Sequence, residues 1–494
     1  MYLLGIDIGT SSIKVSVVEV KTQKRIATAQ YPELEAVIKS IKPGWAEQSP
    51  LDWWENAQQA ILKLNATNLF NPKDIAAIGI AYQMHGLVVV DKDQHILRDS
   101  IIWCDSRAVE IGEKAFDEIG HEKALNSLLN SPGNFTASKL AWIKENEPAI
   151  YQKIDKIMLP GDFIAMKLTG KITTTISALS EGIFWDFKQD KLSKDVMGYY
   201  GLEHKFIPEL NELFSSHGIL TNQVASSLGL SAGIPVAYKS GDQPNNALSL
   251  NVLKPGEVAA TAGTSGVIYG VSDSLTYDPR SRVNTFAHVT YSAEQKNTGV
   301  LLCINGTGSM YRWAKHTFAA TLDYNQLNVL ASKSPIGSKG LKVLPFGNGA
   351  ERMLKNRYTG AQFLGIDLNI HSQADIFRAV QEGIAFSFRY GLDIMREIGM
   401  RPKVIRAGRA NLFLSDVFAQ TFVDVTGIPL ELYENDGSVG AALGAGIGAG
   451  IFKTTEEAFT LHEVITILNP KNSKDYEPIY QEWSKKLEKQ LIDQ

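Results

Sequence analysis

The sequence predicts an α/β protein built from two related domains, and three observations lead to this prediction. The chain has 494 residues, which is too long for one typical hydrophobic core. Short apolar, β-branched runs alternate with amphipathic helical patterns, as in α/β domains. A Gly-Thr-Ser turn at residues 9–11 recurs as a near copy at residues 263–265, about half the chain later.

The first element is expected to be a β-hairpin of residues 3–7 and 13–20. Residues 8–12 have the sequence Ile-Gly-Thr-Ser-Ser, so the hairpin tip offers backbone N–H groups and hydroxyls that suit an anion. Asp7 ends the first strand at the same place, and a carboxylate there suits a hydrated Mg²⁺. These features indicate a site for a nucleoside triphosphate tail; the alternative is an ordinary hairpin with a surface acid.

The second copy of the turn is expected between strands at residues 257–261 and 267–271. Asp7 corresponds there to Thr261, so only the first copy carries an acid. One carboxylate on the metal side and two phosphate turns fit this pattern better than two equivalent sites. We therefore expect both turns to face a cleft between domains comprising residues 1–244 and 245–494.

Composition excludes several classes of function. A hydrophobic content of 44% and a charged content of 21% are ordinary for a soluble globular protein. The net charge of −4, without a long basic run, argues against nucleic-acid or membrane-surface binding. Cys104 and Cys303 are isolated from each other, and no signal peptide is recognised, so a reducing, cytoplasmic location is expected.

Capping signals place several helices along the chain. Ser49 before a proline predicts a helix over residues 50–64, and a capping box at 372–375 precedes a long helix with a core face. Ser415 and Gly427 are expected to bound another helix. Residues 439–452 are mostly glycine and alanine and too short to span a bilayer, which predicts a closely packed core helix. Residues 171–185 are expected to be loop and short strand, and residues 188–229 mostly helical.

Two loops carry candidate ligand-binding side chains. Gln83, Met84 and His85 follow a buried strand at residues 75–81, and α/β sheets bind ligands at this end of their strands. Glutamine and histidine exchange hydrogen bonds with hydroxyls, whereas methionine can line the apolar face of a sugar; the alternative is a structural histidine. Asp105 and Arg107 follow another apolar strand, and they can fork onto polyol hydroxyls or form a surface ion pair.

Asp242 is the candidate general base. It follows a strand at residues 235–238 and lies close to the middle of the chain, between the two phosphate turns in sequence. A carboxylate in that position can take the proton from an attacking hydroxyl as it meets the γ-phosphate. The alternative is an aspartate that caps the following helix.

These motifs together resemble the FGGY carbohydrate kinase family, within the actin-like ATPase (ribonuclease H-like) fold. The likeness covers nearly the whole chain, and the order and spacing of its motifs are highly specific. Its motifs are residues 7–14 (Asp-Ile-Gly-Thr-Ser-Ser-Ile-Lys), 83–86 (Gln-Met-His-Gly), 103–107 (Trp-Cys-Asp-Ser-Arg), 139–146, 241–242, 262–265 and 437–442.

The resemblance implies phosphoryl transfer from ATP, with Mg²⁺, to a sugar alcohol, with Asp242 as catalytic base and Asp7 near the metal. Within the family the chain most resembles the xylulokinases, which implies the 5-hydroxyl of D-xylulose as acceptor; ribulose, gluconate and glycerol are the alternatives. The residues implied for the sugar are Gln83, Met84, His85, Asp105, Arg107 and Asp242. Those implied for ATP are Gly9, Thr10, Ser11, Ser12, Lys14, Gly263, Thr264, Ser265, Gly408 and Asn411. A homodimer is a family-level expectation.

One departure from the family concerns the adenine side. Xylulokinases usually carry a glycine-rich turn there, whereas residues 406–415 read Arg-Ala-Gly-Arg-Ala-Asn-Leu-Phe-Leu-Ser. Fixing Gly408 in the comparison requires an insertion, and fixing Ser415 and Asp424 removes the turn. The sequence is compatible with both alignments.

Two functions from other classes are alternatives. An actin-like, ATP-driven assembly or chaperone protein has no use for the polyol-type loops at residues 83–86 and 103–107. A catalytically idle sugar sensor is disfavoured because Asp7, Asp242 and both turns are intact. Whether ATP consumption requires a sugar discriminates among these functions.

Overall fold

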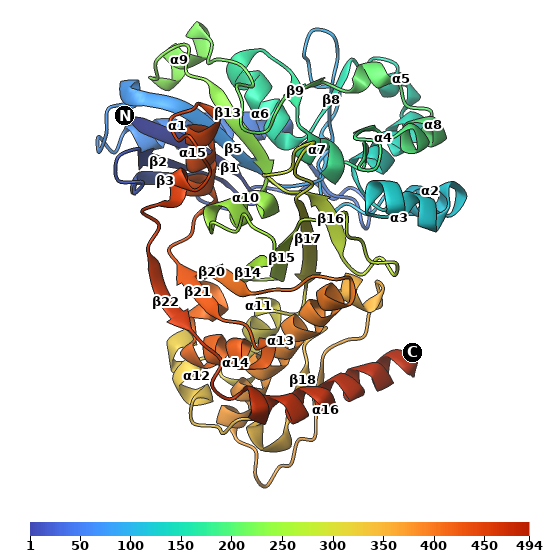
Figure 1. Cartoon of the computed structure of the whole chain (residues 1–494), viewed down its shortest axis with the longest axis vertical. Coiled ribbons are helices and arrows are strands. Elements are labelled where there is room, and N and C mark those ends of the chain that lie inside the picture. Colours follow the sequence, from blue (N-terminus) through green and yellow to red (C-terminus); the bar gives the residue numbers. More distant parts are fainter. Residues whose placement is uncertain (494) are drawn as a thin grey trace. The chain divides into compact units, whose positions relative to one another are not determined.

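The computed structural model describes residues 1–493, which form two compact units (Figure 1). Unit 1 comprises residues 1–253, 286–298 and 436–462, and unit 2 comprises residues 254–285, 299–435 and those from 463 onward. The sequence-based division has a single junction after residue 244, whereas unit 1 also includes two later segments. The reason is packing, because Leu248 and Leu253 share a buried cluster with Ala441 and Ala442.

Unit 1 is built on a five-stranded sheet with the strand order β13-β5-β1-β2-β3. Its strands are β1 (Tyr2–Ile8), β2 (Ile13–Glu19), β3 (Arg25–Tyr31), β5 (Ile75–Tyr82) and β13 (Val236–Gly241). The pairs β1–β2 and β2–β3 are antiparallel, and β5 lies parallel to both β1 and β13. The predicted N-terminal hairpin is therefore confirmed, and the parallel strands bring the ends of β1, β5 and β13 to one edge of the sheet.

The two faces of this sheet bury different helices, as the alternation of side chains along a strand requires. On one face, Leu4, Ile6 and Ile8 share a cluster with residues of α1 (Pro50–Asn65) and α6 (Pro160–Thr169). On the other face, Leu3 packs with α15 (Gly437–Gly448), the small-residue helix that the sequence predicts (Figure 1). The helix α10 (Asp242–Ser249) follows β13 directly and contacts α15.

A facing pair of glycines lets α15 approach the sheet closely. Gly5 in β1 pairs with Gly79 in β5. A Cβ added at Gly5 would overlap the carbonyl oxygen of Ser438, and one added at Gly79 would overlap that of Ala441. The backbone of α15 therefore lies directly against the two strands.

The remaining elements of unit 1 include the antiparallel pairs β4–β7 and β6–β8. In chain order they are β4 (Glu47–Gln48), β6 (Val88–Val90), β7 (Ser100–Ile101), α2 (Val109–Ile119), α3 (His121–Leu128), α4 (Thr136–Asn146), α5 (Pro148–Tyr151), β8 (Lys156–Met158), β9 (Thr173–Thr174), α7 (Ile176–Glu181), β10 (Trp185–Asp186), β11 (Lys191–Leu192), α8 (Lys194–Tyr200), β12 (Glu209–Leu210) and α9 (Asn222–Leu228). Short 3₁₀ helices lie at Pro72–Asp74, His204–Phe206 and Glu457–Phe459. Two expectations were wrong here: residues 171–185 contain a helix, α7, and residues 188–229 are mostly loop, turn and short strand around α8 and α9.

A seven-stranded sheet with the order β16-β17-β15-β14-β20-β21-β22 is built from unit 2, apart from Phe286 and Ala287 of β16 and Thr298 of β17, which are grouped with unit 1. Its strands are β14 (Glu257–Ala262), β15 (Gly266–Ser272), β16 (Asn284–Ala287), β17 (Thr298–Ile304), β20 (Val404–Gly408), β21 (Leu430–Tyr433) and β22 (Val464–Leu468). The β14–β15 hairpin is antiparallel, and β14 is parallel to β20, so the second predicted turn is confirmed at residues 263–265.

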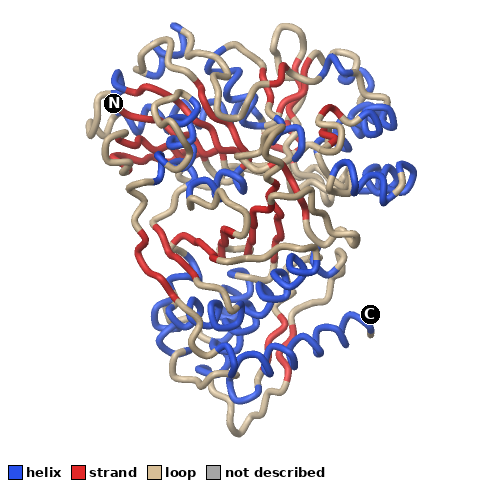
Figure 2. Tube along the Cα trace, in the orientation of Figure 1, coloured by secondary structure: helices blue, strands red, loops and turns tan. Residues whose placement is uncertain are grey.

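Helices and a small second sheet complete unit 2 (Figure 2). They are α11 (Gly308–Phe318), α12 (Tyr324–Ala331), β18 (Lys342–Leu344), β19 (Gln362–Leu364), α13 (Gln373–Glu397), α14 (Asp416–Thr426) and α16 (Ser473–Ile492), with 3₁₀ helices at Ser338–Gly340, Arg352–Leu354 and Asn411–Leu414. Ser415 caps α14 through the backbone N–H of Phe418, and Gly427 ends it in a left-handed conformation, as predicted. Among residues 1–493, none of the helices combines the length and apolar composition needed to cross a membrane.

Candidate active site

The first predicted phosphate turn is braced by hydrogen bonds within unit 1. The Thr10 hydroxyl donates to Gln83 Oε1 at 3.1 Å and accepts from Trp103 Nε1 at 2.9 Å. The amide of Gln48 donates to the Thr10 carbonyl oxygen at 2.8 Å, and Gln83 donates to Gln48. Gln83 therefore supports the turn, and this contact was not anticipated from the sequence.

Asp7 is the last residue but one of β1 and lies beside the N-terminus of α15. A Cβ added at Gly437 would overlap the Asp7 carboxylate, so a larger residue at that point of the helix would have to displace the Asp7 side chain. Desolvation raises the pKa of Asp7 to about 6; the Asp436 carboxylate adds to the increase, and the Lys14 ammonium opposes it. Asp7 is therefore held close to a helix N-terminus, whose dipole favours negative charge.

Lys14 is engaged in an ion pair. Its Nζ lies 2.5 Å from Asp436 Oδ2, and Asp436 also accepts from the backbone N–H of Ser438 at the start of α15. This pairing fixes α15 against the first hairpin. The role of Lys14 in binding ATP stays a prediction.

Asp242 begins α10 immediately after β13, at the same edge of the sheet as Asp7. Desolvation raises the pKa of Asp242 to about 7, and the Asp7 carboxylate adds to the increase, whereas the hydrogen bonds from Gln243 oppose it. Both aspartates keep part of their surface accessible. A carboxylate with a pKa near neutrality and access to a ligand has the properties of a general base.

Met84 and His85 lie in the turn after β5. A Cβ added at Gly241 would lie 2.6 Å from Met84 Cγ, so Met84 packs directly beside the residue that precedes Asp242. His85 Nδ1 lies 3.1 Å from the Glu181 carbonyl oxygen, and its ring packs 4.8 Å from that of Phe135. The structure therefore brings Met84, His85 and Asp242 to one place.

Lys139 donates a hydrogen bond to the backbone of this turn, and sequence reasoning gave it no role. Its side chain is fully buried, and its Nζ donates to the carbonyl oxygens of His85 at 2.8 Å and Ile102 at 3.1 Å. Burial lowers the pKa of Lys139 to about 7, although the Asp105 carboxylate opposes this change. The sequence of a helix does not show which carbonyl oxygens a lysine side chain will contact, so this role of Lys139 could not be predicted.

Asp105 and Arg107 pair with each other inside unit 1. The Asp105 side chain is fully buried and accepts from Arg107 Nη2 at 2.7 Å and from the backbone N–H of Ala46 at 2.6 Å. The Arg107 guanidinium also pairs with Glu47 at 2.6 Å and lies 3.8 Å from the Trp45 ring centroid. The structure accounts for both charges through this buried network, and their predicted contact with the sugar stays a prediction.

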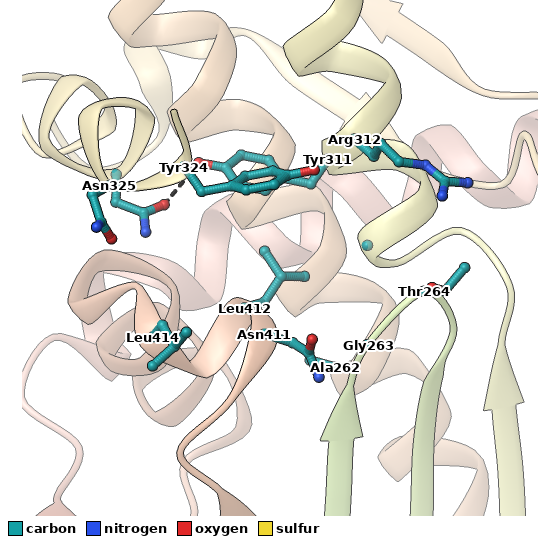
Figure 3. Close-up of a pocket in the computed structure, with 12 residues that line it drawn as sticks. Ala262, Gly263, Thr264, Tyr311, Arg312, Tyr324, Asn325, Asn411, Leu412 and Leu414 are labelled. Carbon is teal, nitrogen blue, oxygen red and sulfur yellow. Dashed lines mark hydrogen bonds between the residues drawn. The ribbon is translucent and has the colours of Figure 1, made fainter. Parts of the chain in front are cut away.

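Unit 2 contains a cavity of about 310 Å³ beside the second turn (Figure 3). It is lined by Ala262, Gly263, Thr264, Gly308, Tyr311, Arg312, Tyr324, Asn325, Asn328, Asn411, Leu412 and Leu414. Figure 3 shows the Tyr311 and Tyr324 rings overlapping on one side, with Asn411 and Leu412 opposite; the ring centroids are 5.8 Å apart.

The N-terminus of α11 shapes the second turn. The backbone N–H of Gly308 donates to the Gly263 carbonyl oxygen at 2.9 Å, and that of Ser309 donates to the Thr264 carbonyl oxygen at 3.0 Å. A Cβ added at Gly308 would overlap Gly263. Of the two residues predicted on the adenine side, Asn411 lines the cavity, whereas Gly408 ends β20 and is not among the residues that line it.

This architecture of two α/β units, each with a glycine–threonine–serine hairpin tip, is that of the actin-like ATPase fold. Residues 2–249 match the family model for the N-terminal domain of the FGGY family of carbohydrate kinases, and residues 258–450 match the model for the C-terminal domain. The chain therefore belongs to the FGGY family of carbohydrate kinases, whose members use ATP.

Individual relatives narrow the similarity within this family to xylulose kinases. The chain is 28% identical to the xylulose kinase of Escherichia coli (strain K12) over 93% of this chain and 91% of that protein. It is 30% identical to the xylulose kinase of Staphylococcus epidermidis (strain ATCC 12228 / FDA PCI 1200) over 97% of this chain and 95% of that protein. The crystal structure of xylulose kinase from Rhodospirillum rubrum covers 98% of both chains with 26% identity and a TM-score of 0.88.

Proposed function

We propose that this carbohydrate kinase transfers the γ-phosphoryl group of ATP to the 5-hydroxyl of D-xylulose. The convergence of Met84, His85 and Asp242 at the ends of β5 and β13 carries the proposal, because it combines an apolar surface, a hydrogen-bonding ring and a base. Relatives named xylulose kinase that align over nine-tenths of the chain support the choice of sugar.

In the proposed reaction, Asp242 accepts the proton of the attacking hydroxyl. The bond between the sugar oxygen and the γ-phosphorus forms as the bond to the β–γ bridging oxygen breaks, and ADP leaves. The backbone N–H groups of Thr10, Ser11 and Ser12 bind phosphate oxygens, whereas that of Gly9 donates to the Ser12 carbonyl oxygen and so shapes the turn. Met84 and His85 orient the sugar, and Lys139 holds the His85 carbonyl oxygen and so keeps the turn in place.

Asp7 fits the Mg²⁺ ion that the family implies. The carboxylates of Asp7 and Asp242 repel each other, which makes ionisation of both groups less favourable. Lys14 does not offset this repulsion fully, because it is paired with Asp436. Oxygen ligands with unneutralised charge and partial access are the ligands that hydrated Mg²⁺ prefers. When bound, the ion neutralises charge on the phosphates.

The cavity in unit 2 is proposed to bind the adenosine part of ATP. Its volume, two tyrosine rings and leucines suit a flat heterocycle, and Asn325, Asn328 and Asn411 offer donors and acceptors to its edge. The adjacent tip at Gly263, Thr264 and Ser265 then lies where phosphates leave the cavity. In this proposal Asn411, rather than Gly408, is the adenine-side contact.

One assay tests the proposed activity. ADP release is measured with a panel of D-xylulose, D-ribulose, glycerol, xylitol and D-gluconate, with Mg²⁺ and without any sugar. We expect D-xylulose to give the highest kcat/KM and ADP release to require a sugar. A higher kcat/KM with another acceptor would reject D-xylulose, and sugar-independent turnover would favour the assembly-protein alternative. Light scattering of the purified protein tests the predicted homodimer.

Replacing His85 by alanine is expected to raise the sugar KM about tenfold or more while changing the ATP KM by less than about twofold, because one well-placed hydrogen bond is worth about 1.4 kcal/mol. Initial rates measured at varied sugar and at varied ATP check this split. Equal changes in both KM values would indicate a structural histidine.

A further inference from the structure

Glu181 lies among the residues proposed to bind the sugar, although sequence reasoning did not identify it. It ends α7, and its side chain is 2% exposed. A Cβ added at Gly241 would lie 3.0 Å from Glu181 Oε2, and His85 Nδ1 lies 3.9 Å from the same oxygen. Glu181 therefore contacts the residue before Asp242 on one side and His85 on the other.

The carboxyl group of Glu181 is poorly satisfied by the fold. Among residues 1–493, neither of its oxygens has a hydrogen bond of ordinary geometry, although the Tyr82 hydroxyl and the His85 ring face it. A buried polar group left unsatisfied costs about 1–3 kcal/mol, and more when it is charged. Asp162, another buried acid near it, is instead paired with Lys239 at 2.6 Å. The fold thus satisfies Asp162, whereas Glu181 interacts with Tyr82 but has no hydrogen bond of ordinary geometry among residues 1–493.

Electrostatics agrees with this geometry. Burial raises the pKa of Glu181 well above its ordinary value, the carboxylates of Asp242 and Asp162 add to the increase, and Tyr82 and Lys139 oppose it. Hydrogen bonds from a ligand would relieve the cost of burying this group.

We propose that Glu181 recognises the acceptor, its carboxyl group hydrogen-bonding two neighbouring hydroxyls of a neutral ketose or polyol beside Asp242. This inference rests on the proposed function. The two oxygens of one carboxyl group can each engage one hydroxyl of a vicinal diol, and such a diol supplies the well-formed hydrogen bonds that this group lacks among the described residues.

The same surroundings select against an acceptor that carries a carboxylate. Lys139 donates its hydrogen bonds to backbone carbonyl oxygens, and Arg107 is paired with Asp105 and Glu47. A sugar acid such as gluconate would bring another anion near Asp242 and Glu181, with both of these cations already engaged. Glu181 is accordingly a specificity-determining residue for neutral acceptors.

The test compares Glu181→Ala and Glu181→Gln with a matched control, Asp186→Asn. Asp186 lies five residues later and is equally buried, but its Oδ1 accepts from the backbone N–H groups of Lys188 and Gln189, each at 3.0 Å. Each variant is assayed with the best neutral acceptor of the panel, with monodeoxy analogues of that acceptor, and with D-gluconate. Thermal unfolding of each variant is recorded in parallel.

We expect Glu181→Ala to raise the sugar KM by about tenfold or more and the ATP KM by less than about twofold. Glu181→Gln, which keeps one acceptor and gains a donor, is expected to stay within about threefold of the wild-type sugar KM. The decisive result is non-additivity: removing one hydroxyl from the acceptor should raise the wild-type KM but add little in Glu181→Ala. Asp186→Asn should change the melting temperature without changing the sugar KM.

Each other outcome has a defined meaning. If the wild type phosphorylates D-xylulose and Glu181→Ala keeps its sugar KM, or if the deoxy effect is the same in both proteins, the inference fails and the proposed function stands. If the best acceptor is another neutral polyol and the non-additivity appears, the inference stands and D-xylulose is rejected. Preference of the wild type for D-gluconate, or for no acceptor, overturns both.

Discussion

Replacing Asp242 by asparagine is expected to lower kcat by about 10²–10⁴-fold, the usual contribution of a general base, while the sugar still binds. Asparagine has nearly the same shape as aspartate but cannot accept the hydroxyl proton. Single-turnover rates measure the chemical step, and calorimetric titration with D-xylulose measures binding. Near-normal turnover of a folded variant would remove Asp242 from the role of base.

The pH dependence of the wild type provides a second readout. Because the base must be ionised and the pKa of Asp242 is raised to about 7, kcat/KM should fall as the pH drops below about 7. In Asp242→Asn the residual activity should lose this dependence. An unchanged acid limb in the variant would assign the limb to another group.

The same substitution should stabilise the folded protein in the absence of metal and nucleotide. A carboxyl group whose pKa rises on folding, here from 3.8 to about 7, makes folding less favourable as the pH increases through this interval. The wild type should therefore lose stability between about pH 4 and 7, by at most about 4 kcal/mol and less because Asp242 keeps partial solvent access. Asp242→Asn avoids this loss, so its advantage in urea unfolding should be larger at pH 8 than at pH 4.

Local patterns were sufficient to predict most of the elements that position the site. The two hairpins follow from β-branched runs around glycine and hydroxyl turns, and Ser415 and Gly427 mark the ends of α14 as capping rules require. Asp7 and Asp242 could both be named because each lies at the carboxyl end of a strand, and the parallel order of β1, β5 and β13 brings these ends together.

Long-range pairing was not predictable in the same way. The sequence shows that Asp105 and Arg107 are charged and close, but Glu47 and Trp45, which complete their buried network, lie about sixty residues earlier. Glu181 could not be identified from the sequence. What distinguishes it is that its carboxyl group has no well-formed hydrogen bond among the described residues. Whether a polar group is satisfied is a property of the packed structure, and periodicity along the chain does not contain it.

Replacing Gly5 by alanine is expected to destabilise unit 1 by about 3 kcal/mol or more, because overpacking against backbone cannot be relieved by a change of rotamer. The added Cβ would overlap the carbonyl oxygen of Ser438 in α15. The facing Gly79 is in equally close contact with the carbonyl oxygen of Ala441. A fall in the urea midpoint, or loss of folded protein, checks this prediction. Gly198→Ala in α8 is the control, since a Cβ there meets nothing within 4 Å and should stabilise the helix by about 0.5–1 kcal/mol.

This substitution also connects packing to function. Asp7 lies two residues after Gly5 on the same face of β1, and its carboxylate touches the first residue of α15, Gly437. Moving α15 outward would therefore displace Asp7 relative to Asp242, so folded Gly5→Ala protein should lose kcat as well as stability, while its sugar KM changes less. A variant of wild-type stability with full kcat would show that α15 does not press on the strand, and the position of Asp7 would then need another explanation.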